Sequence, residues 1–264
     1  MPAINLPRLK IQTAKLMESF NEPDRFLSEL HDLFELYADR TFRAGAIVSP
    51  VSVLPSYRVP LPVIRHLELE LGARTRNDYE GGMALADRLW DEGNYESRTL
   101  AAYLLGCVPP FGEEYLERLS GWVVETRDPL LSTKLLSSSL TRMRTESPDE
   151  FLTLMGRWEQ MPHKIMWSSV MVALVPLLED KNFHNLPSVL NVIQPIIEAA
   201  PATMQKELSE LIHTLYESSP IEATYFLRHL ISASQKPHTK QNIRRILPSL
   251  PDKLQTELRE ELRK

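Results

Sequence analysis

The sequence predicts an all-α fold, specifically an α-α superhelix of HEAT-like repeats, from three observations. The first is composition: the 264 residues contain 20 Pro but only 9 Gly, and no Gly follows residue 156. Because glycine supplies the positive φ angles of tight hairpins and phosphate-cradling loops, β-sandwiches, Rossmann sheets and P-loops are disfavoured. The other two observations are apolar residues that recur at helical spacing and helix-start signals at short intervals along the chain.

The helix-start signals combine a capping residue with a glutamate or a proline. Asn77, Ser147 and Ser219 each stand three residues before a Glu, which is the spacing of a capping box. Asp128 and Ser219 are each followed by a proline, which is favoured at the first position of a helix. These signals predict helices that begin at each of the four residues.

Apolar stripes follow these starts in order along the chain. They cover residues 26–37, 85–90, 100–107, 151–158, 208–215 and 226–231. We predict about fourteen helices, with successive pairs recurring every ~35–40 residues, the period of HEAT-type repeats. For residues 44–57 we predict a short hairpin or an extended loop instead, because the stretch contains Pro50 and Pro55.

We predict a single domain over residues 1–264, with N-terminal helices and a loop in 1–57 and the repeats in 58–264. The composition, 43% hydrophobic and 25% charged, is that of an ordinary globular protein. The single cysteine, Cys107, leaves no disulfide and no Cys-based zinc site, and the seven histidines form no ligand pair. With no signal peptide and no membrane-length apolar stretch, we expect a cytoplasmic protein without membrane, metal or cofactor.

Charge is distributed unevenly on this chain of net charge −5. Residues 81–130 hold 4 basic and 9 acidic side chains. No acidic residue occurs in 223–251, which carry five basic ones: Arg228, Lys236, Lys240, Arg244 and Arg245. This stretch is either a solvated helix face or a contact for a phosphate backbone.

Two stretches carry a resemblance to a known family. Residues 59–106 include VPLPVIRHLELELG and MALADRLWDEGNYESRTLAAYLLG, and MQKELSELIHTLYESSP and KPHTKQNIRRIL follow from residue 204. The chain resembles the HEAT-like-repeat DNA alkylation repair proteins of the AlkD type over about two-thirds of its length. The resemblance implies a helical-repeat protein that holds duplex DNA on a concave face and removes positively charged alkylated bases.

The chain departs from that family's catalytic pattern, W-D-x-x-D. The corresponding residues here are RDPLL, so Arg127 stands at the tryptophan and Leu131 at the catalytic aspartate. Asp128 alone is retained, and a second family tryptophan falls near Glu210. The resemblance therefore implies the fold, with glycosylase activity weak, altered or absent.

Three residues near this junction have two interpretations each. Asp128 is a candidate catalytic carboxylate or the N-cap of the helix that begins at Pro129. Arg98 matches an arginine of the family and either faces phosphate or pairs with Glu96 or Asp91. Trp122 is either a displaced aromatic contact to DNA or a core residue.

Three functions follow from these observations. The first is a duplex-DNA-binding member of the alkylation repair superfamily that uses Arg98, Arg127, Lys240, Arg244 and Arg245 on the sugar-phosphate backbone. The alternative is a catalytically inactive protein-interaction scaffold that holds a protein partner on its concave face. The third is an active glycosylase with a rearranged carboxylate. The net charge favours the scaffold, while the acid-free stretch favours DNA binding.

Overall fold

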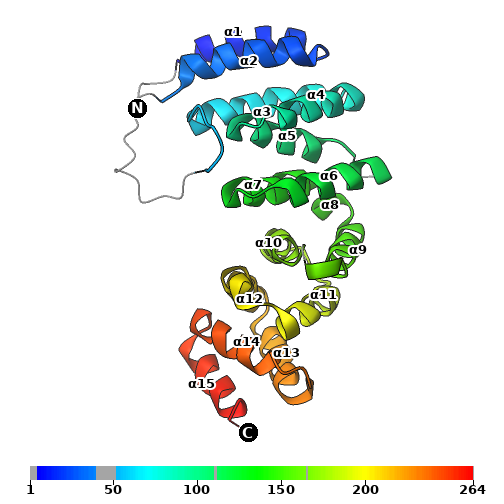
Figure 1. Cartoon of the computed structure of the whole chain (residues 1–264), viewed down its shortest axis with the longest axis vertical. Helices are drawn as coiled ribbons and strands as arrows, with labels where there is room; N and C mark the ends of the chain where they lie inside the picture. Colours follow the sequence, from blue (N-terminus) through cyan, green and yellow to red (C-terminus); the bar gives the residue numbers. More distant parts are fainter. Residues whose placement is uncertain (1–4, 40–51, 110–111, 165, 264) are drawn as a thin grey trace. The chain divides into compact units, whose positions relative to one another are not determined.

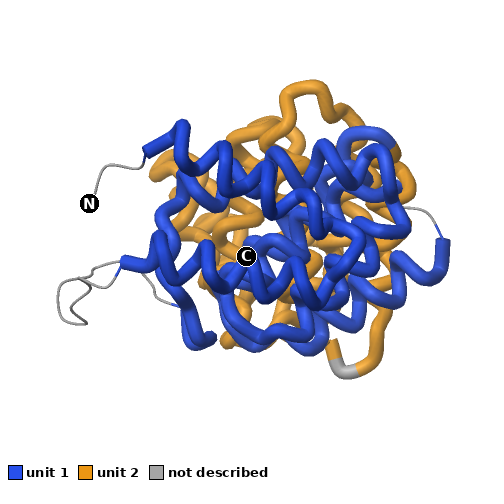
Figure 2. Tube along the Cα trace, turned by 90° about the horizontal axis from the view of Figure 1, so that it is seen from above, with its two compact units in different colours: residues 1–146 blue, residues 147–264 orange. Residues whose placement is uncertain are grey.

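A computed structural model describes residues 5–39, 52–109, 112–164 and 166–263 (Figure 1). Within these ranges the regular structure consists of fifteen α-helices and four short 3-10 turns. The predicted fold class, an all-α helical-repeat fold, is confirmed. The chain forms two compact units, residues 1–146 and 147–264, drawn in blue and orange in Figure 2.

Unit 1 arranges its helices in two layers. Its helices are α1 (Leu6–Leu16), α2 (Pro23–Tyr37), α3 (Leu61–Thr75), α4 (Tyr79–Asp91), α5 (Tyr95–Cys107), α6 (Glu113–Glu125), α7 (Pro129–Ser139) and α8 (Thr141–Glu146). One layer runs α1, α3, α5, α7, each packed on the next. On the other side α2 packs on α4, α4 on α3 and α5, and α6 on α7 (Figure 1).

Unit 2 repeats this arrangement with seven described helices. They are α9 (Pro148–Glu159), α10 (Trp167–Leu178), α11 (Leu186–Ala199), α12 (Gln205–Ser218), α13 (Pro220–Ala233), α14 (Thr239–Ile246) and α15 (Asp252–Glu261). Helices α10, α12 and α14 follow one another in one layer, while α9 packs on α11 and α13 on α15. Each unit buries the apolar stripes that the sequence predicts, with Trp90 the largest fully buried side chain in unit 1 and Trp158 in unit 2.

The predicted helix starts are correct to within one residue, but the predicted caps are only partly so. Asp128 begins α7 as expected. The N-cap of α4 is Asp78 rather than Asn77, because the Asp78 carboxylate reaches the Gly81 N–H at 2.9 Å, the third helical residue. Ser147 and Ser219 begin α9 and α13, but their side chains make no capping hydrogen bond, so the capping boxes predicted there are wrong.

At the ends of four helices, long cationic side chains satisfy carbonyl groups. Of the described glycines, only Gly93 and Gly112 have positive φ, and only Gly93 directly follows a helix C-cap. Cationic side chains instead donate to carbonyl oxygens at helix ends: Arg142 to Cys107 (3.3 Å), Arg144 to Leu136 and Ser137 (3.1 and 2.7 Å), Lys164 to Ala199 (2.6 Å) and Arg244 to Leu262 (3.1 Å). At these four ends cations do what a glycine C-cap does elsewhere, and their charge also suits the negative end of the helix dipole.

Candidate nucleic-acid interface

Asp128 lies at the junction between α6 and α7, where the sequence places its candidate catalytic carboxylate. Oδ1 accepts the Leu131 N–H at 2.8 Å, which is the N-cap bond of α7. Oδ2 accepts both the Ser52 hydroxyl and the Val53 N–H at 2.6 Å. The side chain is 2% exposed, so both oxygens are covered by the donors that bind them.

These donors keep Asp128 ionised. Burial by itself raises the pKa of a carboxylate, but the hydrogen bonds from Ser52, Leu131 and Val53 favour the charged form and outweigh it. The pKa of Asp128 is therefore below its ordinary value. The arrangement is that of a structural anion, which caps a helix and holds a distant segment against it.

Glu96 holds the rest of the same segment. Its carboxylate, 4% exposed, accepts the Ser56 hydroxyl at 2.7 Å and the N–H groups of Tyr57 and Arg58 at 3.2 and 2.7 Å. Residues 52–59, which we call the strap, are thereby fixed at the start of α5 and α7. The strap contains no regular element; residues 44–51 of the predicted hairpin or loop lie outside the described residues.

Arg98 is enclosed by α4 and α6. Its Nη2 donates to Glu125 at 2.6 Å and its Nε to the Trp90 carbonyl at 3.0 Å, with the guanidinium 4.7 Å from the centre of the Trp90 ring. Trp90 also stacks on Trp122 at 4.3 Å, with the two rings 2° from parallel. Trp122 is therefore a core residue, and the acid that pairs with Arg98 is Glu125 rather than Glu96 or Asp91.

Arg127 differs from Arg98 in its exposure to solvent and in its partners. It lies exposed in the turn between α6 and α7, next to the buried Asp128. Within the described ranges its guanidinium makes no ion pair or hydrogen bond. The position that a tryptophan occupies in the family pattern thus presents an available cation at this junction.

The three candidate cations of unit 2 lie on α14. Lys240 is half-buried at the edge of a cavity and has no polar partner in the part of the chain that the structure describes. Arg244 donates through one Nη to the Leu262 carbonyl at 3.1 Å. Arg245 donates through one Nη to the Asn242 side chain at 3.3 Å. Each arginine keeps further N–H donors on its guanidinium.

The acid-free stretch, residues 223–251, has fewer unpaired cations in the folded protein than its five basic residues suggest. Arg228 is bound by Glu257 at 2.8 Å and by Glu261 at 3.1 Å, both from α15. The ammonium group of Lys236 is 2.6 Å from Glu198 at the end of α11. Acids distant in sequence therefore neutralise two of its five cations, which no local charge count could show.

A cavity of about 710 Å³ beside α13 was not predicted from the sequence. Tyr225, His229 and Lys240 line it together with Arg228, Ile231, Ser232 and Glu261. A signal was present, since Tyr225 falls outside the apolar stripe of residues 226–231 that predicts the buried face of α13. An aromatic residue on the polar face of an amphipathic helix indicates a surface contact.

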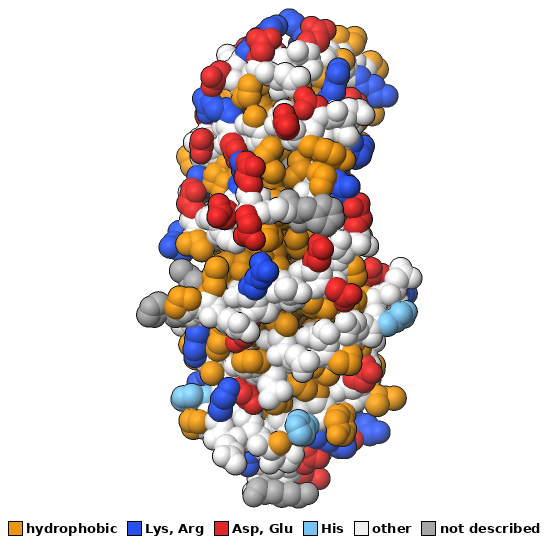
Figure 3. All heavy atoms as spheres, turned by 90° about the vertical axis from the view of Figure 1, so that its right-hand side faces the viewer, with side chains coloured by type: hydrophobic (Ala, Val, Ile, Leu, Met, Phe, Trp, Pro, Cys, Tyr) orange, Lys and Arg blue, Asp and Glu red, His pale blue; other side chains and the backbone are white. Residues whose placement is uncertain are grey.

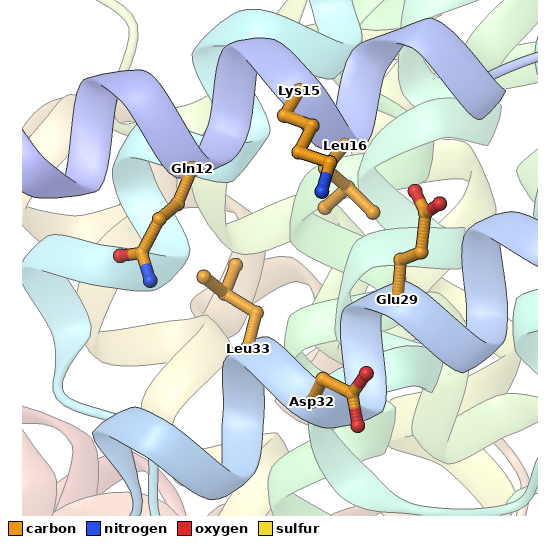
Figure 4. Close-up of a pocket in the computed structure, with 6 residues that line it drawn as sticks. All are labelled: Gln12, Lys15, Leu16, Glu29, Asp32 and Leu33. Carbon is orange, nitrogen blue, oxygen red and sulfur yellow. The ribbon is translucent and has the colours of Figure 1, made fainter.

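A smaller cavity of about 230 Å³ lies between α1 and α2 (Figure 4). Lys15 points from α1 toward α2, where Glu29 and Asp32 line the opposite side (Figure 4). The Glu29 carboxylate is already bound by Ser19 at 2.8 Å and Arg25 at 3.1 Å. Across the described residues no three potential metal ligands lie together.

Acidic side chains gather over the upper part of the face drawn in Figure 3. Unit 1 contains the acidic stretch of residues 81–130, in which Glu113, Glu114 and Glu117 follow one another along α6. No helix among the described residues is long and apolar enough to cross a membrane. Any contact with a polyanion in unit 1 therefore depends on the cations that acids leave unpaired.

Comparison with known protein families identifies the family to which the chain belongs. The family model of the DNA alkylation repair enzymes matches residues 51–247, a span that includes the strap and helices α3 to α14. Searches of curated proteins and of solved structures found no match. The matched span covers about three quarters of the chain and includes both stretches that carry the resemblance. This chain belongs to the DNA alkylation repair enzyme family.

Proposed function

We propose that this protein binds duplex DNA through the sugar-phosphate backbone, on the concave surface expected of helical repeats, and that Asp128 takes no part in base removal. The observation that carries the proposal is the family match over residues 51–247. The unpaired cations within that range supply the chemistry, because neutralising phosphates releases counterions and drives binding without reading sequence.

The five predicted cations differ in how readily they reach a phosphate. Arg127 and Lys240 come first, since neither gives up a partner among the described residues. Arg244 and Arg245 come second, because each uses one guanidinium nitrogen within the protein. Arg98 comes last, since contact with DNA would break its 2.6 Å bond to Glu125.

Base removal is not expected from the residues at the α6–α7 junction. A carboxylate that stabilises positive charge on a sugar must face the nucleotide. Asp128 is covered by the strap and Leu131 is fully buried. The retained aspartate therefore serves the fold, and the family chemistry lacks its acid at this place.

Titration of duplex DNA at several salt concentrations tests the proposal. We expect Arg127→Ala and Lys240→Ala each to weaken binding and to lower the log–log salt slope by about one. Arg98→Ala should have a smaller effect. Lys10→Ala is the matched control. It removes the same charge, and Lys10 is an exposed lysine of α1 that lies outside the family match.

The outcome also separates the proposal from its alternatives. No binding to duplex even at low salt would exclude it and favour the protein-interaction scaffold, which the acidic surface of residues 81–130 supports. Release of 7-methylguanine from a methylated duplex, abolished by Asp128→Ala in a folded protein, would establish the third function, an active glycosylase. We expect no such release from the unaltered protein.

A further inference from the structure

Helix α13 presents an apolar and aromatic ridge on its outer face. Tyr225 is 73% exposed and Ile221, one turn earlier, is 83% exposed. The inner face of the helix is complete without them and consists of buried Ala223, Phe226, Leu227, Leu230 and Ile231. The ridge is therefore not needed by the core of unit 2, and it requires another explanation.

Flat rings line the groove beside this ridge. Tyr225 and His229, one helical turn apart, have nearly parallel rings, 9° between planes and 6.4 Å between centres. Both rings line the cavity of about 710 Å³, and a second cavity of about 450 Å³ adjoins it and shares Tyr225 and Arg228. The wall of the groove that α13 forms thus exposes the aromatic rings of Tyr225 and His229.

Among the described residues around the groove, the charged groups that have no ion-pair partner are cationic. Glu257 and Glu261 are both occupied by Arg228, whose guanidinium bridges them. Lys240 lines the first cavity and Lys253 the second, and in the described part of the chain neither forms an ion pair. One lysine thus lies at each cavity, with Tyr225 common to both.

We propose that this groove binds an unpaired nucleobase of a DNA strand, with the base stacked on Tyr225 and the neighbouring phosphates at Lys240 and Lys253. Exposed aromatic rings beside cations are the means by which proteins hold single strands without reading sequence, since every base has a flat face to stack. The groove then distinguishes paired from unpaired DNA, because bases inside a duplex are already stacked on both faces. This inference rests on the proposed DNA binding and adds the form of DNA that unit 2 recognises.

Fluorescence anisotropy with three DNA probes tests it: a blunt duplex, the same duplex with a single-stranded extension of about eight nucleotides, and the extension alone. We expect the extended duplex to bind more tightly than the blunt one. Tyr225→Ala should weaken binding of the extended duplex about tenfold while leaving the blunt duplex unchanged. Tyr225→Phe keeps the ring and should keep the preference.

The control is Leu69→Ala on α3, which removes an apolar side chain of similar exposure, 66%, without altering an aromatic surface. It should leave all three affinities unchanged. Equal affinity of the unaltered protein for blunt and extended duplexes, or an intact preference in Tyr225→Ala, would overturn the inference while leaving duplex binding in place. Failure to bind any of the probes would overturn the proposed function as well.

Discussion

At the scale of single residues, Asp128 carries more hydrogen bonds than a helix cap requires. It accepts one backbone N–H from α7 and two donors from the strap, 75 and 76 residues earlier in the chain. Asp78, the cap of α4, accepts only the Gly81 N–H among its described side-chain hydrogen bonds. Both residues cap the N-terminus of a helix, but only Asp128 also binds the strap. Comparing the effects of substituting the two therefore measures what the strap contributes.

We predict that Asp128→Asn lowers the free energy of unfolding by about 1–3 kcal/mol at pH 7, because the amide nitrogen cannot accept the bonds from Ser52 and Val53. The folded-state pKa of Asp128 lies below its ordinary value. Its stabilisation is therefore complete above the unfolded pKa of about 3.9 and is lost as the pH falls through the folded value. Urea unfolding at pH 7, 5 and 3 should show the difference between the two proteins shrinking only at the lowest pH.

Asp78→Asn is the matched control, since asparagine caps helices about as well as aspartate. A loss of the same size in both variants would contradict a special role of the strap. The N-cap interpretation of Asp128 was available from the sequence, because the cap, its proline and the residue that donates its N–H to the cap, Leu131, lie within four residues. The contact with the strap could not be predicted from the sequence, because Ser52 and Val53 come close to Asp128 only in the tertiary fold.

At the scale of helices, start signals and end signals differ in how far they can be predicted. A helix begins with residues that are neighbours in sequence, and the predicted starts were correct to within one residue. Some of its last carbonyls are satisfied by partners far along the chain, such as Lys164 for Ala199. This distance explains why Arg142 and Lys164 look like free cations in the sequence, although each donates to a carbonyl at a helix end 35 residues away along the chain.

Arg144 is the strongest of these caps, because it donates to both Leu136 and Ser137 at the end of α7. Burial lowers the pKa of its guanidinium from the ordinary value, but the group remains charged at neutral pH. We predict that Arg144→Lys lowers the free energy of unfolding by about 1–2 kcal/mol, since a lysine cannot reproduce the forked pair of bonds. Arg157→Lys, an exposed change on α9, should leave urea unfolding unaltered, and equal effects would disprove the capping role.

Gly106 sets the distance between α5 and α7. A Cβ added at Gly106 would collide with the Ser138 backbone carbonyl, whereas one added at Gly121 of α6 meets nothing within 4 Å. We predict that Gly106→Ala destabilises the protein by about 1–3 kcal/mol through displacement of the helices. Gly121→Ala should instead stabilise it by about 0.5–1 kcal/mol through higher helix propensity. Thermal unfolding of the two variants must shift in opposite directions, and a shared direction would refute the close approach.

At the scale of the whole molecule, composition together with apolar spacing and helix-start signals predicted the fold class. The low glycine content excludes folds built on tight turns, and the frequent prolines mark helix starts such as those of α7, α9 and α13. Pro176 and Pro195 depart from this pattern, since they lie inside α10 and α11. Ion pairing was not predictable to the same degree, because the acids that neutralise the basic stretch come from α11 and α15.

This pairing decides how binding to DNA should depend on salt. The protein has a net charge of −5, so attraction to DNA must come from cations that remain unpaired. For duplex DNA the slope of log K against log salt is about −0.9 for each phosphate neutralised. Five contacts, one for each predicted cation, give a slope of about −4.5, while Arg127 and Lys240 alone give about −2.

We predict a slope near −2 for a blunt duplex, measured between about 50 and 200 mM salt. The reason is that Arg98, Arg244 and Arg245 already donate to Glu125, Leu262 and Asn242 within the protein. Substituting Glu125 by Gln removes the charge that holds Arg98 and should steepen the slope by up to about one. A slope near −4.5 in the unaltered protein would mean that all three arginines also neutralise phosphates, Arg244 and Arg245 through their remaining N–H donors and Arg98 after leaving Glu125. Arg98→Ala would then weaken binding as much as Arg127→Ala.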